Sequence, residues 1–408
     1  MGWNVRGGAY KGSKRGIIGQ GSLLFNLDFI IFKLTMRINY KFLAGIFSKW
    51  DYIREQFEFS NELLNIDEKI VKEEWRTFEY KGNNEYSIVC GDGSYNTIEY
   101  IDKYIILSSG VGLFFDNKNN SENYTYLSFV LVIPFDVLVR KFLDDLASLI
   151  MSTLELKSIY LTAKKVKHDI ILIDGSIRSL IIRFGPSYSS QIGQRWFYKG
   201  EIDEKEIEKI YYENKDNIYN YDLWSYHLVK SFNRENKFIY FAHLLYYEYL
   251  KVLNDLLTNF EVVSISKSFS PTTGEKIFSL IERPDIIIFE EFTKEVGYSR
   301  KVKYLQEDEF YKWKLPLPFE HLKKKQIFFF YTRFEENHRV YKIEFIKDKE
   351  QEEILRIIYP TIVKGYPAIL KIAHNDALIT DNDVRIFEQH IRNDLRSQVG
   401  IKLREELL

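Results

Sequence analysis

Short apolar runs alternate with amphipathic stretches along most of this chain. Runs of strand length rich in β-branched residues predict strands, and apolar residues three or four positions apart predict helices. The predicted strands cover about 86–91, 99–107, 126–133, 170–173, 179–184, 261–267, 285–290, 326–334 and 339–346, and the predicted helices about 36–80, 135–158, 201–209, 223–259, 349–358 and 381–396. This order indicates an α/β fold with a mixed sheet flanked by helices.

The tripeptide Asp-Gly-Ser follows two of the apolar runs, beginning at Asp92 and at Asp174. Because glycine lets the backbone turn sharply, we expect both aspartates at strand ends, with their carboxylates facing one cleft. Two carboxylates delivered in this way are typical of divalent-metal sites for phosphodiester chemistry. Asp-Gly is also a favoured turn dipeptide, so two plain hairpin turns are the alternative interpretation of this feature alone.

A competing carboxylate, Asp169, precedes the second tripeptide. It begins the apolar strand that Asp174 ends. We therefore prefer Asp174 as the site residue.

Composition is that of an ordinary globular protein with a large core: 408 residues, 45% hydrophobic and 28% charged. Lysine and arginine number 57 against 58 acidic residues, so the net charge of −1 provides no overall attraction for nucleic acid. The single cysteine, Cys90, excludes an internal disulfide and a zinc site built from several cysteines. We interpret Cys90 as a buried core residue and expect a cytoplasmic protein.

The N-terminal segment resembles a signal peptide only superficially. Its apolar stretch at 17–32 is interrupted by Gln20, Asn26 and Asp28, and no uninterrupted apolar run is long enough to span a membrane. We predict that 1–35 is a dispensable extension and that Met36 is the functional start. Residues 36–408 would then form one domain, with helical insertions and a charged insertion or lid near 187–220.

Glu155 falls near the end of a predicted helix between the two aspartates. The series of Asp92, Glu155 and Asp174 resembles the layout of the ribonuclease-H-like nucleases, in which three carboxylates meet at one edge of a mixed sheet. Hard divalent cations prefer oxygen ligands, and phosphodiester hydrolysis needs a metal ion to generate hydroxide and to neutralise charge on the phosphate.

Further motifs make the chain similar to one family. The motifs are Val89-Cys-Gly-Asp-Gly-Ser94, Thr153-Leu-Glu-Leu156, Leu172-Ile-Asp-Gly-Ser176, Ile265-Ser-Lys-Ser268 and Gly365-Tyr-Pro with the later Ala373-His374. In this order they resemble the NurA family of archaeal DNA-end nucleases. They span about 86–377, and their order is more specific than any one of them. The N-terminal extension, the segment 116–123 and the insertion do not match the family motifs.

The resemblance implies a manganese-dependent nuclease, with Mg²⁺ as the alternative metal. It implies 5′-to-3′ exonuclease activity on single- and double-stranded DNA and single-strand endonuclease activity, in end resection and double-strand break repair. The implied partners are a HerA-type hexameric ATPase and a second copy of the chain. Asp92, Glu155 and Asp174 would be metal ligands, and His374 a further ligand or a group that positions water or phosphate. Tyr366 would line the site, and Lys267 would contact a DNA phosphate.

Other interpretations stay open on the sequence. Taken singly, Glu155 is a typical surface carboxylate, and His374 is a typical structural histidine. The whole chain could be a catalytically inactive docking or DNA-end-binding module of the same fold. A glycosidase would instead need two opposed carboxylates and would ignore chelators. Loss of activity on chelation, restored by Mn²⁺, separates the nuclease from both.

Overall fold

A computed structural model provides the fold and describes residues 47–52, 54, 68–82, 85–100, 102–119, 121–134, 143–184, 203–232, 237–267, 277–278, 284–304 and 315–394. The chain divides into two compact units, Met1–Ile66 and Asp67–Leu408, and the description below concerns the second. The predicted extension 1–35 and the predicted start at Met36 lie outside the described residues.

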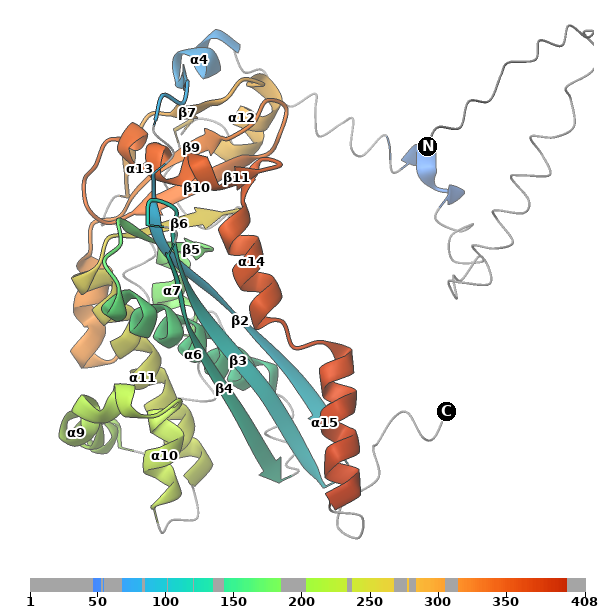
Figure 1. Cartoon of the computed structure of the whole chain (residues 1–408), viewed down its shortest axis with the longest axis vertical. Helices are drawn as coiled ribbons and strands as arrows, with labels where there is room; N and C mark the ends of the chain where they lie inside the picture. Colours follow the sequence, from blue (N-terminus) through green and yellow to red (C-terminus); the bar gives the residue numbers. More distant parts are fainter. Residues whose placement is uncertain are drawn as a thin grey trace, which may run out of the picture. The chain divides into compact units, whose positions relative to one another are not determined.

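A ten-stranded mixed sheet forms the centre of this unit, with its three longest strands side by side (Figure 1). The strands are β1 Trp75–Thr77, β2 Ser87–Glu99, β3 Lys103–Asp116, β4 Ser121–Pro134, β5 Ile170–Asp174, β6 Val262–Ser266, β7 Gly297–Ser299, β8 Val302–Lys303, β9 Phe328–Arg333 and β10 Val340–Phe345. Their order is β1–β7–β9–β10–β6–β5–β2–β3–β4, with β8 beside β9. A separate pair is formed by β11 Ile362–Val363 and β12 Tyr366–Pro367.

Ten α-helices are described, together with three 3₁₀ turns. The α-helices are α4 Glu68–Glu73, α6 Leu143–Lys165, α7 Ile177–Ile182, α9 Glu204–Asn214, α10 Trp224–Lys230, α11 Lys237–Asn259, α12 Asp285–Phe292, α13 Gln351–Ile358, α14 Ala368–Ala377 and α15 Asp381–Asp394. The 3₁₀ turns are η1 Lys215–Asn220, η3 Leu317–Lys324 and η4 Tyr359–Thr361. None of the helices in the described part of the chain combines the length and apolar character needed to cross a membrane.

Half of the sheet is a three-stranded meander that a helix connects to a parallel strand. Strands β2, β3 and β4 form an antiparallel meander, and α6 leads from β4 to β5, which runs parallel to β2. Strand β6 continues parallel to β5, and the hairpin β9–β10 extends the sheet antiparallel beyond it. The predicted mixed α/β fold is therefore confirmed.

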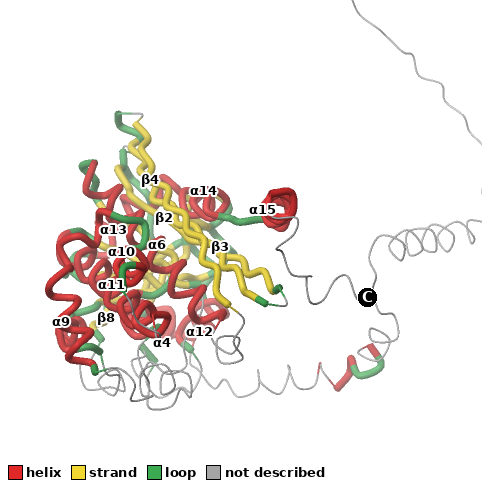
Figure 2. Tube along the Cα trace, turned by 90° about the horizontal axis from the view of Figure 1, so that it is seen from below, coloured by secondary structure: helices red, strands yellow, loops and turns green. Residues whose placement is uncertain are grey.

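Helices cover both faces of the long strands. Helix α6 packs on β2 and β3, α11 packs on α6, and α10 packs on α11. On the opposite face α14 packs on β2 and β3, and the apolar side of α15 covers the far end of both strands. Figure 2 shows α10 and α11 on one side of the long strands and α14 and α15 on the other.

Two glycine pairs let α6 lie directly on the sheet. Gly91 pairs with Gly112, and Gly93 with Gly110, across β2 and β3. An added Cβ at Gly110 would lie 2.4 Å from the carbonyl carbon of Leu154, closer than two such carbons can approach. The backbones of strand and helix can therefore touch only because side chains are absent there. This contact sets how close Glu155 comes to β2.

A buried ion pair connects the helices of the α6 face. Lys157 and Glu248 have fully buried side chains, with Nζ 2.7 Å from Oε1. Glu248 also accepts hydrogen bonds from the backbone N–H groups of Trp224 and Ser225 at the start of α10, and Lys157 donates to the carbonyl of Asp222. A buried charge is tolerated only when it is paired and hydrogen-bonded in this way.

Two predicted strands are helices instead. The run 179–184 belongs largely to α7, because the side chain of Ser176 caps that helix and accepts the backbone N–H of Ser179. The run 285–290 lies in α12, which begins directly after Pro284. A short apolar run has no periodicity that separates helix from strand, so the flanking residues and the packing decide.

Other predicted elements have different bounds. The strands predicted at 86–91, 99–107 and 126–133 are longer, and the polar segment 116–123 narrows to the turn between β3 and β4. The helix predicted over 223–259 is divided into α10 and α11, and the end of the helix predicted over 36–80 forms β1. The sequence does not predict α14, β7 or β8.

Several predictions are confirmed. They are β5, β6, the β9–β10 hairpin, α9, α13 and α15. At the start of α15 the Thr380 hydroxyl accepts the N–H of Asp383, whose carboxylate accepts the N–H of Thr380. This is the predicted capping arrangement.

Candidate metal centre

Asp92 lies in the middle of a strand rather than at its end. It belongs to the 13-residue strand β2 and pairs with Val111 of β3. The predicted strand end is therefore wrong at this position, and so is the alternative of a hairpin turn. Since side chains alternate along a strand, Asp92 shares a face with Cys90. Cys90 is buried, as predicted, and it contacts α14.

His374 meets Asp92 from helix α14. Its Nδ1 lies 2.7 Å from Oδ2 of Asp92. Because an ionised carboxylate only accepts hydrogen bonds, we assign the proton to Nδ1, which leaves Nε2 free for a ligand or a water molecule. The side chain of His374 is 61% exposed, so an incoming substrate can reach it.

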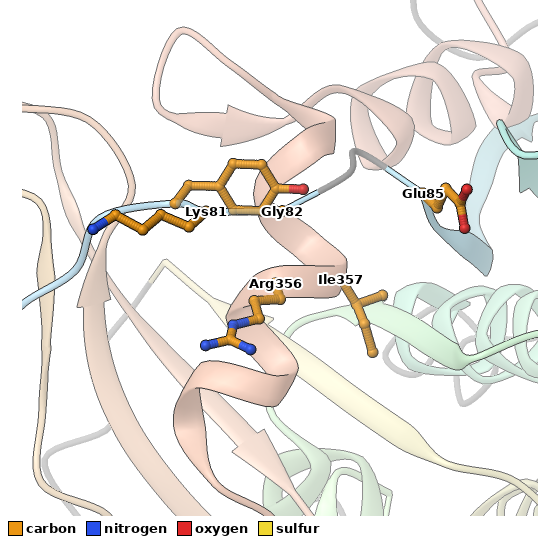
Figure 3. Close-up of a pocket in the computed structure, with 6 residues that line it drawn as sticks. Lys81, Gly82, Glu85, Arg356 and Ile357 are labelled. Atoms are coloured by element: carbon orange, nitrogen blue, oxygen red, sulfur yellow. The ribbon is translucent and has the colours of Figure 1, made fainter.

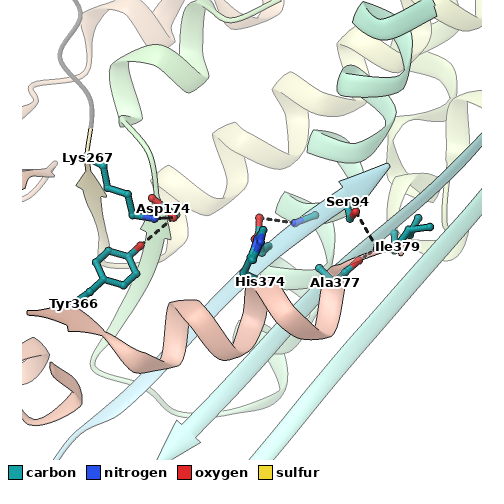
Figure 4. Close-up of polar contacts among 10 residues, drawn as sticks. Ser94, Asp174, Lys267, Tyr366, His374, Ala377 and Ile379 are labelled. Carbon is teal, nitrogen blue, oxygen red and sulfur yellow. Dashed lines mark hydrogen bonds and ion pairs between the residues drawn. The ribbon is translucent and has the colours of Figure 1, made fainter. Parts of the chain in front are cut away.

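Two serine hydroxyls hold the end of α14 on the sheet (Figure 4). Ser109 of β3 donates to the carbonyl oxygen of Ala377 at 2.6 Å, and Ser94 of β2 accepts the N–H of Ile379 at 3.0 Å. Ser94 is the serine of the first Asp-Gly-Ser. These bonds fix α14 against the strand that carries Asp92, and thereby fix His374 over Asp92.

Asp174 ends β5 as predicted and receives two donors. Its Oδ2 accepts hydrogen bonds from Nζ of Lys267 at 2.7 Å and from the hydroxyl of Tyr366 at 2.9 Å (Figure 4). The ammonium of Lys267 also lies 4.3 Å from the centre of the Tyr366 ring. Burial and the neighbouring Asp174 raise the pKa of Tyr366, so its hydroxyl stays protonated and donates. Asp169 lies at the other end of β5, bonded to Ser87.

Glu155 is buried in the middle of α6, not near its end as predicted. Burial raises its pKa to about 8, and the nearby carboxylates of Asp92 and Asp174 contribute to that rise, while Arg183 opposes it. Within the described ranges, no hydrogen-bond donor contacts the Glu155 carboxylate. Three acids therefore lie near one another, and one of them lacks a donor.

The three acids lie where two parallel strands separate. Pairing between β2 and β5 ends at Cys90 and Leu172, after which β2 continues for nine residues and β5 for two. Asp92 lies two residues after this last pair on β2, and Asp174 lies two residues after it on β5. Glu155 approaches from α6. The structure therefore places the six predicted site residues in one region: Asp92 is bonded to His374, Asp174 is bonded to Lys267 and Tyr366, and Glu155 lies beside Gly93 of β2.

The present arrangement is not a ready-made metal cage. In the part of the chain that the structure describes, no three His, Cys, Asp or Glu side chains are grouped closely enough to hold an ion. Asp92 and Asp174 are bonded to protein groups instead. The donor set nevertheless fits a hard divalent cation, because it offers three carboxylates and one imidazole, and a cation would relieve the repulsion around buried Glu155.

Sequence reasoning missed three residues of this region. Arg183, the residue that follows α7, is a cation near Glu155, and it also donates to the hydroxyl of Ser148. Ser94 and Ser109 fasten α14. Serine after Asp-Gly was visible in the sequence, but its partner, the N–H of Ile379 just after α14, was not.

A hollow of about 630 Å³ lies elsewhere, between the segment around Tyr80 and helix α13 (Figure 3). Its two cations, Lys81 and Arg356, pair with Glu79 and Glu352. None of the predicted site residues lines it, so it does not belong to the carboxylate site.

Comparison with known proteins identifies the family of the chain. The NurA domain matches residues 86–379, which is most of the chain and includes every predicted site residue. The chain belongs to the NurA family of nucleases. Among curated proteins, it is 27% identical over 356 residues to the probable DNA double-strand break repair nuclease NurA of Methanocaldococcus jannaschii, covering 80% of this chain and 84% of that protein.

Solved NurA structures share the fold. The NurA nuclease from Sulfolobus solfataricus matches with a TM-score of 0.62 at 21% identity, over 87% of this chain and 98% of that one. A crystal structure of NurA with manganese matches with a TM-score of 0.64 at 19% identity, over 88% of this chain and all of that one. A third, of NurA bound to dAMP and manganese, has a TM-score of 0.57 at 17% identity, over 90% of this chain and 98% of that one.

Proposed function

We propose that this chain is a metal-dependent DNA nuclease that acts in double-strand break repair in the cytoplasm. The observation that carries the proposal is the convergence of Asp92, Glu155 and Asp174 where β2 and β5 separate. Support also comes from the relative named as a DNA double-strand break repair nuclease and from NurA structures that contain manganese and dAMP.

Asp92, Glu155, Asp174 and His374 would hold Mn²⁺, with Mg²⁺ as the alternative. When bound, such a cation lowers the pKa of water and neutralises charge on the phosphate. Oxygen ligands suit either metal, and the imidazole Nε2 of His374 suits Mn²⁺ better than Mg²⁺. His374 would alternatively position water or phosphate.

The other site residues act on the substrate or on the carboxylates. Tyr366 donates to Asp174 and so orients that carboxylate. Lys267, 43% exposed, is the cation that a DNA phosphate can reach once it leaves Asp174. Contacts of this kind read the backbone rather than the bases, so cleavage would have little sequence preference and strong salt dependence.

The finer activities and partners follow from the family resemblance. We propose 5′-to-3′ exonuclease activity on single- and double-stranded DNA, single-strand endonuclease activity, and end resection with a HerA-type hexameric ATPase. The chain would act as a homodimer. Supporting the homodimer, the edge strand β4 exposes Tyr124, Tyr126, Val130 and Val132 on one face.

The pairing of β4 with β3 accounts for the apolar character of this stripe, which we define as Tyr124, Tyr126, Val130 and Val132. Tyr126 lies opposite Val111, and Val130 opposite Leu107, on the face that α14 and α15 cover over β2 and β3. At β4, none of the described helices covers that face, and the four side chains are exposed. Extended apolar patches and long edge strands are seldom left exposed on monomers.

The test is Mn²⁺-dependent degradation of end-labelled single- and double-stranded DNA. We expect Asp92→Ala and Asp174→Ala to lower the rate at least about 1,000-fold, because each removes a carboxylate ligand. Asp169→Asn is the matched control, since it changes an aspartate at the opposite end of the same strand and should retain activity. If the wild-type protein cleaves no DNA, either alone or with a HerA-type ATPase, the result favours the inactive docking module.

A further inference from the structure

The turn that follows Asp174 is attached to a buried carboxylate, Glu344 of β10. The Glu344 side chain is 1% exposed. Both of its oxygens accept hydrogen bonds from the hydroxyl of Ser176, at 3.0 and 2.8 Å, and one accepts the N–H of Arg178 at 3.3 Å. Ser176 is the serine of the second Asp-Gly-Ser and the capping residue of α7.

Further groups surround the same carboxylate. The hydroxyl of Tyr304 donates to Glu344 at 2.8 Å, and Nζ of Lys342 lies 3.2 Å away and also contacts the Tyr304 hydroxyl. The guanidinium of Arg178 lies 4.9 Å from the centre of the Tyr304 ring. A buried carboxylate with this many donors is held in one position, because leaving any of them unpaired is costly.

The chain between Asp174 and Ser176 has little freedom. Asp174 pairs with Ile265 of β6, and the N–H of Gly175 donates to the Ile265 carbonyl at 2.8 Å. Gly175 has a φ of +117°, a conformation that glycine adopts far more readily than other residues. The strand thus fixes the turn on one side, and the Ser176–Glu344 bonds fix it on the other.

We propose that Glu344 is a positioning residue for the metal centre, acting through Ser176 to hold the Asp174 carboxylate toward Asp92 and Glu155. Glu344 bonds to Ser176, Tyr304 and the N–H of Arg178 and to none of the proposed metal ligands, so its effect on the metal would be indirect. Groups that orient a metal ligand from behind typically change metal affinity by about 10- to 100-fold when they are removed. This inference rests on the proposed metal-dependent function.

The test measures Mn²⁺ binding by titration calorimetry, beside thermal unfolding without metal. We expect Glu344→Gln and Ser176→Ala to raise the dissociation constant for Mn²⁺ about tenfold or more. Ser176→Thr keeps the hydroxyl and should bind Mn²⁺ like the wild type. The nuclease rate of the two weakened variants should rise toward that of the wild type as Mn²⁺ is increased.

Asp285→Asn is the control for a purely structural loss. Asp285 is equally buried, accepts the N–H groups of Ile277 and Phe278, and lies on α12. The Asp285→Asn substitution should lower the unfolding temperature without changing the affinity for Mn²⁺. If Glu344→Gln fails to fold, Ser176→Ala and Ser176→Thr still test the positioning role.

The outcomes separate the two proposals. Wild-type Mn²⁺ affinity in Ser176→Ala, or in a folded Glu344→Gln, would overturn the positioning role alone. Absence of Mn²⁺ binding by the wild-type protein would refute the proposed function and this inference with it.

Discussion

At the scale of single residues, the site gathers three acids, and burial with the two nearby aspartates raises the pKa of one of them, Glu155, to about 8. Asp174 has Lys267 and Tyr366 as partners, and Asp92 has His374, but Glu155 is buried near both aspartates. Such a site is costly without a cation and gains stability when one binds. The Glu155 carboxylate is therefore the most sensitive probe of metal binding.

The raised pKa of Glu155 predicts that metal affinity and stability change with pH in opposite directions. Because its pKa is raised from 4.5 to about 8, metal must displace a proton at neutral pH, and Mn²⁺ affinity should rise from about pH 6 to about pH 8. In that range the native protein holds a proton that the unfolded chain has lost. The metal-free free energy of unfolding should therefore fall as pH rises from about 4.5 to about 8.

Calorimetry of Mn²⁺ binding and denaturant unfolding, each over a pH series, check both signs. Glu155→Gln cannot titrate, so it should flatten both curves and be about 1–3 kcal/mol more stable than the metal-free wild type at pH 8. A variant whose curves follow those of the wild type would show that another group titrates.

At the scale of elements, the site depends on how closely α6 approaches β2 and β3. The approach is possible because Gly93 and Gly110 face each other directly beneath the helix. Glu155 is carried by α6, so any change in the distance between this helix and the sheet moves the carboxylate relative to Asp92.

Gly110→Ala tests this contact. The new Cβ would meet backbone atoms of Leu154 and Glu155, at 2.4 and 2.5 Å, and a helix backbone cannot rotate aside as a side chain can. We expect a loss of about 1–3 kcal/mol in stability and, from displacement of Glu155, about a 100-fold lower rate at saturating Mn²⁺. Chemical denaturation and single-turnover cleavage measure the two effects.

Gly82→Ala is the matched control. There the three atoms nearest to the new Cβ all belong to the side chain of Tyr80, which can move. Its stability and rate should stay close to those of the wild type. Equal effects of the two substitutions would mean that the loss comes from glycine itself and not from the helix contact.

The element scale also shows where sequence patterns are sufficient. β5, β6 and the β9–β10 hairpin were predictable because each is a β-branched or aromatic run bounded by polar residues. α7 and α12 were not, since their apolar runs are too short to show a helical period. The length of β2 was hidden by Gly91 and Gly93, which weaken a strand pattern although here they serve helix packing.

At the scale of the whole molecule, the exposed stripe on β4 is where we expect the second copy of the proposed homodimer to bind. Val130 is one of the exposed apolar residues of β4 and pairs with Leu107 of β3. A glutamate there would place an unpaired charge in an apolar contact. We expect Val130→Glu to raise the dimer dissociation constant at least about tenfold, as measured by analytical ultracentrifugation.

Leu317→Glu serves as the control for that substitution. Leu317 is 77% exposed on η3, which packs on α11, so its variant should sediment like the wild type. A wild-type monomer at micromolar concentration would refute the homodimer. A dimer that survives Val130→Glu would place the interface elsewhere.

The sequence by itself determined the class of fold and the order of most of its main elements, because apolar periodicity and helix caps act over a few residues, and it suggested the acids that we propose as the site. Tertiary structure alone decided that Asp92 lies within a strand, that His374 reaches it from 282 positions away, and that Ser176 is bonded to Glu344. These contacts depend on the pairing of β2 with β5 and on the packing of α14. No local pattern encodes such pairing, since it follows from which distant surfaces bury one another.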